Sequence, residues 1–174
     1  MAVREILLLG NPILRTKCAK VKDFNDPSVH KTVDDLIDTL SDFRSKHGFG
    51  RGIAAPQIGN MQRIIIVTVD VPTPLINPII FNRSRKSMTL WDDCFSFPDI
   101  LVKVKRSTEI LVRYWDQSGK KQEIKAVEGM SELIQHEIDH LDGILAVDRA
   151  IDSHHIILRS EWEKRFESSK KHLL

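Results

Sequence analysis

The amino-acid sequence predicts an α+β domain in which antiparallel or mixed strands pack around one central, buried helix. Short β-branched and apolar runs dominate the middle of the chain, a helical spacing of apolar residues precedes them, and a largely apolar helix with the motif H-E-x-x-H follows them. The chain has 174 residues, which fits one domain of ordinary size. We therefore expect residues 1–174 to form a single metallohydrolase domain.

The N-terminal third predicts an arm, a helix and a glycine-rich segment. Residues 1–25 mix turn-forming residues with an irregular basic stretch, which is typical of a covering arm. Asp26 is a good N-cap and Pro27 suits the first helical position, so an amphipathic helix is expected from there to Gly48. The run 48–59 lacks the Lys-Ser/Thr ending of a phosphate-binding loop. It predicts either a tight loop on the core or a strand whose free backbone groups pair with an extended peptide.

The remaining elements are mostly strands. Strands are expected at residues 63–69, 75–81, 100–105, 109–115 and 121–127. The second of these contains Pro78, which cannot donate to a ladder, so we place it at the edge of a sheet. The helix with the motif should run from near Met130 to Gly143. A C-terminal helix is expected from Ser153 to about Lys171, with Ile156, Ile157, Trp162 and Phe166 as its apolar residues.

The composition excludes several classes of function. The formal net charge is +2 and, apart from basic clusters at 83–86 and 103–106, the charges are scattered, so we expect no direct nucleic-acid binding. No apolar stretch approaches the ~20 residues of a membrane span. The N-terminus lacks the features of a signal peptide, and we expect a cytoplasmic protein with no membrane partner. The two cysteines form no disulfide framework, so each is core filler or a metal ligand.

The segment from Gln135 to Gly143 carries the H-E-x-x-H motif. His136 and His140 are four residues apart, so they share one face of a helix and can hold one metal ion. Glu137 would act as general base on the water held by that metal. The alternative is a pair of core histidines that bond to carbonyl groups.

A catalytic metal of this type needs a third protein ligand. The metzincin pattern would place a histidine at Ala146, which cannot coordinate, so that reading fails. Glu161 or Glu163 on a following helix would complete a thermolysin-like site. Cys94, in the aromatic and acidic block 91–98, is the remaining candidate.

Three blocks make the chain resemble the peptide deformylase family, whose members remove the formyl group from nascent proteins. Residues 50–57 are similar to the family's G-x-G-x-A-A-x-Q, residues 92–96 to E-G-C-L-S, and residues 135–143 to Q-H-E-x-D-H-L-x-G. Supporting matches lie at residues 11–15 and 75–78 and at Arg106. The resemblance runs from about residue 6 to residue 150.

The resemblance implies a metal centre and a mechanism. The implied ligands are Cys94, His136 and His140. They would hold one divalent ion, iron(II) in the first place, with zinc, nickel or cobalt as alternatives. A metal-bound hydroxide would attack the formyl carbon with Glu137 as acid/base, while Gln57 and the Phe95 backbone N–H would form an oxyanion hole. The implied partner is an N-formylated peptide or a nascent chain at the ribosome.

The candidate substrate-binding residues and the departures from the family pattern both lie in the first two of these three blocks. The candidate substrate-binding residues are Gly50, Arg51, Gly52, Ile53 and Asp93. Asp92 replaces a glutamate that pairs in the family with the arginine matched by Arg106, and it is one methylene shorter. Asp93 replaces a glycine and adds negative charge beside a thiolate. Arg51 replaces an apolar residue at the mouth of the cleft and would favour acidic substrates.

These departures leave three functions open. The chain is an ordinary deformylase, a divergent paralogue that hydrolyses another N-formyl or small amide substrate, or an inactive metal-binding protein that captures peptides. The general base at Glu137 and the amide at Gln57 are both retained, and neither is needed merely to hold a metal. Their retention argues against the inactive protein.

Overall fold

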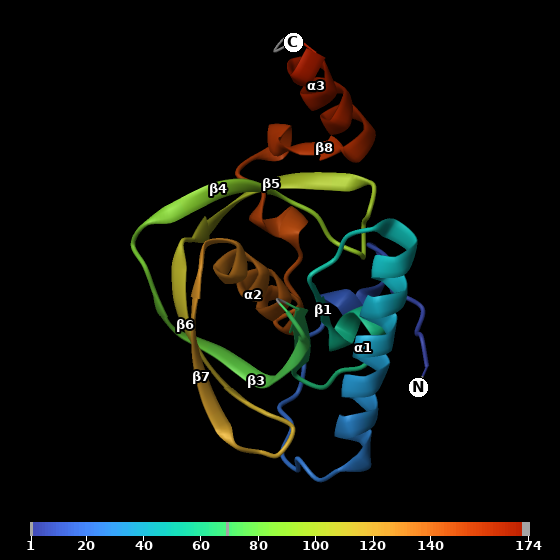
Figure 1. Ribbon diagram of the computed structural model, residues 1–174, viewed down its shortest axis with the longest axis vertical. Helices are drawn as coiled ribbons and strands as arrows, with labels where there is room; N and C mark the ends of the chain where they lie inside the picture. Colours follow the sequence, from blue (N-terminus) through green and yellow to red (C-terminus); the bar gives the residue numbers. More distant parts are fainter. Residues whose placement is uncertain (1, 69, 172–174) are drawn as a thin grey trace.

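The computed structural model describes residues 2–68 and 70–171, with side chains described up to residue 165 apart from residue 69 (Figure 1). Within that part the chain forms two antiparallel sheets and three α-helices, so the α+β class is confirmed. Val69, at the end of a predicted strand, and the side chain of Phe166 lie outside the described part. None of the described helices contains a stretch long and apolar enough for a bilayer crossing.

The two sheets differ in size. The five-stranded sheet has the order β1-β2-β3-β6-β7, with β1 at Gly52–Ala54, β2 at Ile64–Thr68, β3 at Pro72–Arg83, β6 at Glu109–Trp115 and β7 at Lys121–Val127. The three-stranded sheet has the order β4-β5-β8, with β4 at Ser87–Asp92, β5 at Ile100–Ser107 and β8 at Ile156–Leu158. All named strands pair antiparallel. In Figure 1 the strands curve around helix α2.

Helix α2, Glu128–Leu141, carries the motif and is buried at every residue from Ser131 onward. It packs against β1, β2, β5, β6 and β7. The helix begins two residues before the predicted Met130 and ends just before Gly143, which has φ +74°. A Cβ at that glycine would lie 2.7 Å from the carbonyl oxygen of Arg15, so the close approach of the N-terminal arm requires glycine there.

Helix α1, Pro27–His47, has the predicted bounds. The Asp26 side chain accepts a hydrogen bond of 2.8 Å from the Ser28 N–H, and the helix ends at Gly48 with φ +77°. The face formed by Val33, Leu36 and Leu40 is buried against β1 and β2. The amphipathic pattern therefore corresponds to a helix that packs one face against the core.

The placement of the proline-containing strand was wrong. Strand β3 is an inner strand, paired with β2 on one side and β6 on the other. The ladder with β6 shifts register between Ile76 and Ile79, and Asn77 adopts φ +51° at that shift. The Asn77 side chain accepts from the Val21 N–H at 2.9 Å and donates to the Val21 carbonyl at 2.8 Å. This irregularity takes Pro78 out of the ladder, so the proline needs no edge.

One other expectation needs correction, and one strand was not predicted. The predicted helix from Ser153 begins only at Arg159, as α3, Arg159–Lys171. Before it, Ile156 and Ile157 form β8 and pair with β5, because β-branched side chains suit a strand and β5 offers an open edge there. Strand β4 was not predicted, since its pattern mixes polar and apolar residues without a long β-branched run.

Candidate metal centre and catalytic cleft

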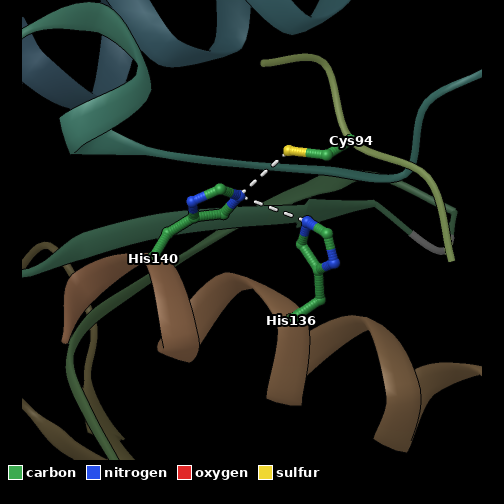
Figure 2. A group of neighbouring side chains, drawn as sticks. All are labelled: Cys94, His136 and His140. Carbon is green, nitrogen blue, oxygen red and sulfur yellow. Dashed lines mark hydrogen bonds between the residues drawn. The ribbon is translucent and has the colours of Figure 1, made fainter. Parts of the chain in front are cut away.

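Three buried side chains converge beside α2 (Figure 2). The Nε2 atom of His140 lies 3.2 Å from Nε2 of His136 and 3.2 Å from Sγ of Cys94. A tetrahedral ion with nitrogen ligands at about 2.0–2.1 Å and sulfur at about 2.3 Å separates its ligands by roughly 3.3–3.6 Å. The three donor atoms therefore fit one metal ion. Thiolate and imidazole donors suit iron or zinc.

The competing ligands lie elsewhere. Glu161 and Glu163 are exposed on α3, and Glu161 pairs with Lys164 at 2.5 Å, so neither belongs to this group. Cys18 is buried in the arm and donates its backbone N–H to the carbonyl of Leu141. Burial raises the pKa of the Cys18 thiol to about 11, which is the environment of a core residue.

Asp92 orients one of the candidate ligands. Its carboxylate lies 2.9 Å from Nδ1 of His136 and 3.1 Å from Nη2 of Arg106, so the shorter side chain still makes the predicted pair with the arginine. Burial alone would raise the pKa of the Asp92 carboxyl, but His136 and Arg106 hold it below its ordinary value. Because Asp92 occupies Nδ1, the Nε2 atom of His136 faces Cys94 and His140.

Glu137 lies in the same cleft but outside the group of three donors. Its side chain is buried, and its Oε2 atom has no hydrogen-bond partner within the described residues. Burial raises the pKa of the carboxyl to about 7. A Cβ at Gly52 would lie 2.6 Å from Oε1 of Glu137, so strand β1 approaches this carboxylate as closely as only glycine allows.

Gln57 is held in a single orientation next to Cys94. It is on a short 3₁₀ helix, Ala55–Ile58, directly after β1, and its Oε1 atom accepts from the Ala54 N–H at 2.9 Å. Its amide nitrogen therefore points to Sγ of Cys94, at 3.6 Å, and to the hydroxyl of Ser96, at 3.3 Å. The amide is a preorganised donor toward the three candidate metal ligands.

Gln57, Cys94, His136 and Glu137 line a cavity of about 530 Å³. The ring of Phe95 forms part of the lining and stacks on Phe43 at 3.8 Å between centroids. No hydrogen bond is donated by the Phe95 N–H within the described part of the chain. Gly50 and Gly52 line the cavity from β1 and the turn before it, whereas Ile53 is fully buried in the core.

The two charged residues expected at the cleft are both paired. Arg51, with 55% of its side chain exposed, lies 2.6 Å from the carboxylate of Glu132, a buried residue that the sequence analysis did not single out. Asp93 pairs at 2.7 Å with Arg159, the first residue of α3, and its backbone is not left-handed. Each charge therefore faces an opposite one, and neither stands alone beside the thiol.

Glu132 had a signal in the sequence. It lies four residues before His136, so it occupies the same side of α2 and also lines the cavity. Burial raises the pKa of its carboxyl, and Arg51 opposes that shift. Arg159 had no such signal, because its place beside Asp93 depends on the path of β8.

Comparisons with known proteins agree with this geometry. The family model described as polypeptide deformylase matches residues 3–155. A peptide deformylase of Dictyoglomus thermophilum is 39% identical over 151 residues, which cover 86% of this chain and 94% of the relative. The crystal structure of peptide deformylase from Thermotoga maritima superposes with a TM-score of 0.80 at 33% identity and covers 87% of this chain and 100% of that one.

A second structure bears on the cleft. The class I type b peptide deformylase from Acinetobacter baumannii, with Met-Ala-Ser bound, is similar with a TM-score of 0.78 at 28% identity. The likeness covers 85% of this chain and 98% of that one.

Proposed function

Because this chain belongs to the peptide deformylase family, we infer that it is a metal-dependent hydrolase that removes the N-formyl group from formyl-methionyl peptides of nascent proteins. The observation that carries this inference is the convergence of Cys94, His136 and His140 on one point beside Glu137, a buried carboxylate outside the group of donors. We propose that residues 1–174 act as one such domain, in the cytoplasm, on chains at the ribosome.

The three donors would hold one divalent ion, and we propose iron(II). Two imidazoles and one thiolate leave a fourth position for water or substrate in a tetrahedral site. When bound, the ion supplies Lewis-acid chemistry, which makes water more acidic and polarises the formyl group. Asp92 supports this role by holding His136 in the orientation that presents Nε2.

The proton transfers belong to Glu137. Its carboxylate lies in the cavity without a fixed partner for Oε2, so it is free to take a proton from the attacking water and to give it to the leaving amine. The negative charge that develops on the formyl oxygen would be stabilised by the Gln57 amide and the Phe95 N–H. The Ala54 N–H fixes the Gln57 amide in advance, so little reorganisation accompanies the reaction.

The peptide would lie along β1. Among the described strands β1 pairs with β2 alone and so lies at the edge of its sheet, and Gly50, Arg51 and Gly52 line the cavity. An extended peptide can add to such an edge through backbone hydrogen bonds. The A. baumannii relative, which has Met-Ala-Ser in its crystal, supports a peptide as ligand. Ile53 would contribute its backbone only, and Asp93 lies at the rim with Arg159.

The test is turnover by iron-loaded protein prepared without oxygen, because iron(II) with a thiolate ligand is prone to oxidation. Formyl-Met-Ala-Ser should release formate, and acetyl-Met-Ala-Ser, which carries a methyl group in place of the formyl hydrogen, should react far more slowly. Protein that holds one iron per chain but releases no formate would contradict the proposal. Zinc-, nickel- and cobalt-loaded samples in the same assay would rank the metals.

A second candidate is a paralogue with a changed substrate. The Arg51–Glu132 pair favours it, because it places two charges on the wall of the cavity. Formylated peptides with acidic, neutral and basic side chains distinguish the two functions. An ordinary deformylase should turn over neutral formyl-Met peptides best, while a changed substrate would make them the poorest of the set.

A further inference from the structure

A second cavity lies beside α2, away from the metal centre. It has a volume of about 390 Å³ and is lined by α2 residues Gln135 and Asp139 and by the ends of β3 and β5. The pairing of β4 with β5 and of β3 with β6 brings together two basic clusters that are about twenty residues apart in the sequence. One supplies Arg83 and the other supplies Lys105 and Arg106.

The cations at this cavity exceed the carboxylates. Arg83, Lys105, Arg106 and Arg149 line it, and Asp139 is the one carboxylate among its described lining residues. Arg83 donates to the neutral amide oxygen of Gln135 at 2.8 Å and forms no ion pair in the described part of the chain. Lys105 is exposed and likewise has no carboxylate partner among the described residues. Two cationic side chains therefore face the cavity without a counter-charge.

Asp139 forms no hydrogen bond or ion pair with either of them, because its oxygens already accept from Arg106 and Arg149. Arg149 donates to Asp139 twice, at 2.8 and 3.2 Å, and Arg106 on β5 also donates to Asp139. Arg106 is buried, shares its charge between Asp139 and Asp92, and keeps an Nε–H that finds no acceptor in the described residues. Partial burial lowers the pKa of Arg83. The negative charge of Asp139 opposes this shift, whereas repulsion from Arg149 and Arg106 lowers the pKa further.

We propose that this cavity binds the phosphate group of a small molecule, a phosphate monoester or inorganic phosphate. A phosphate oxyanion would accept hydrogen bonds from the planar guanidinium of Arg83 and from the ammonium of Lys105. The hydroxyl-bearing residues Ser87 and Ser107 line the same cavity and supply further donors. The cavity is a concave hollow lined by residues of β3, β4, β5 and α2, which suits a small ligand more than a nucleic-acid backbone.

The experiment is a titration of the zinc-loaded protein with inorganic phosphate at constant ionic strength, followed by NMR at the Ser107 backbone amide and the Gln135 side-chain amide. The test variant is R83Q/K105Q. The matched control is R85Q/K103Q, which removes the same charge from the turn that follows β3 and from β5, at residues that do not line the cavity. All four side chains belong to exposed or half-buried residues, so neither variant opens the core.

We expect saturable shifts at both amides in the millimolar range or below, with affinity at least about tenfold weaker in R83Q/K105Q and nearly unchanged in R85Q/K103Q. Equal losses in the two variants would mean general attraction to a basic surface and would overturn the proposal. So would retained binding in both variants, which would place the phosphate at the metal. Tighter binding of a single-stranded oligoribonucleotide than of phosphate, with the same dependence on Arg83 and Lys105, would replace the proposal with a nucleic-acid site.

Discussion

The two sides of helix α2 treat buried polar atoms in opposite ways. On one side, Gln135 uses both ends of its amide, which accepts from Arg83 and Ser107 and donates to Ser131. Asp139, one turn later, is fully engaged by two arginines. On the cleft side, Oε2 of Glu137 is buried and has no partner within the described residues.

This difference indicates that one side of α2 holds the fold together and the other side carries the chemistry. A buried polar atom without a partner costs about 1–3 kcal/mol, and such an atom inside a cleft indicates that a ligand completes its hydrogen bonding. The saturated side of α2 ties the helix to β5 and to the segment after the helix. The unsaturated side is where a metal ion, water and substrate would complete the hydrogen bonding. Changes on the cleft side should therefore remove activity, and changes on the other side should mainly lower stability.

The largest effect on activity should come from replacing Cys94, with Cys18 as its comparison. Cys94→Ala removes the one sulfur donor of the cleft, and we expect no stoichiometric metal and no measurable deformylation. Cys18→Ala is the matched change in the core and should keep one metal per chain, with a modest loss of stability from the smaller side chain. Metal analysis and formate release measure both. Metal loss in Glu161→Ala, together with retention in Cys94→Ala, would instead favour the thermolysin-like site.

Replacement of Glu137, the proposed general base, should spare the metal and slow the reaction. Glu137→Gln keeps the shape of the side chain but cannot accept a proton, so kcat should fall about 10²- to 10⁴-fold with metal content unchanged. Rate measurements on samples matched for metal content test this. A metal-loaded variant that turns over at the wild-type rate would remove Glu137 from the mechanism.

Replacement of Gly52, which lies next to Glu137, should lower kcat almost as much. Gly52→Ala would place a Cβ 2.6 Å from Oε1 of Glu137 and push the carboxylate aside, which we expect to lower kcat about a hundredfold. Gly129→Ala is the control, because a Cβ there meets only the end of the Arg51 side chain, at 3.4 Å. Similar kcat values in the two variants would show that the close approach of β1 has no catalytic role.

The two aspartates that share Arg106 compare the two sides of α2 directly. Asp92→Asn weakens the support of His136, and we expect metal affinity to fall about 10- to 100-fold. Asp139→Asn removes a carboxylate from the saturated side and should lower the unfolding temperature while metal affinity changes less than about threefold. Competition with a chelator and thermal unfolding provide the two readings. Equal metal affinities would mean that the contact between Asp92 and His136 is not a support for the ligand.

The smallest effect should come from the charged wall of the cleft. Arg51→Met leaves the Glu132 carboxylate uncompensated and should disfavour acidic formyl peptides, whereas Glu132→Gln frees Arg51 and should favour them. Because Arg51 is half exposed, we expect only about a threefold change in relative kcat/KM in each direction, under 1 kcal/mol. Arg113→Met is the control, because Arg113 on β6 forms an exposed pair with Glu123 on β7. Shifts in the same direction for both cleft variants would contradict the pairing argument.

The sequence by itself determined the features that depend on neighbours along the chain. The α+β class, the bounds of α1 and the location of His136 and His140 on one face of a helix follow from local periodicity and capping. Three family-like blocks were also readable, because they are short and continuous.

The tertiary structure decided what depends on contacts between distant residues. The pairing of β8 with β5 brought Arg159 to Asp93, and the packing of α2 on β1 brought Glu132 to Arg51, so that two charges expected to stand free in the cleft are neutralised. It also placed Pro78 in an inner strand and joined two basic clusters around one cavity. Spacing along the chain sets which side chains share a face, but register and packing between elements set which charges meet, and no local pattern encodes those distances.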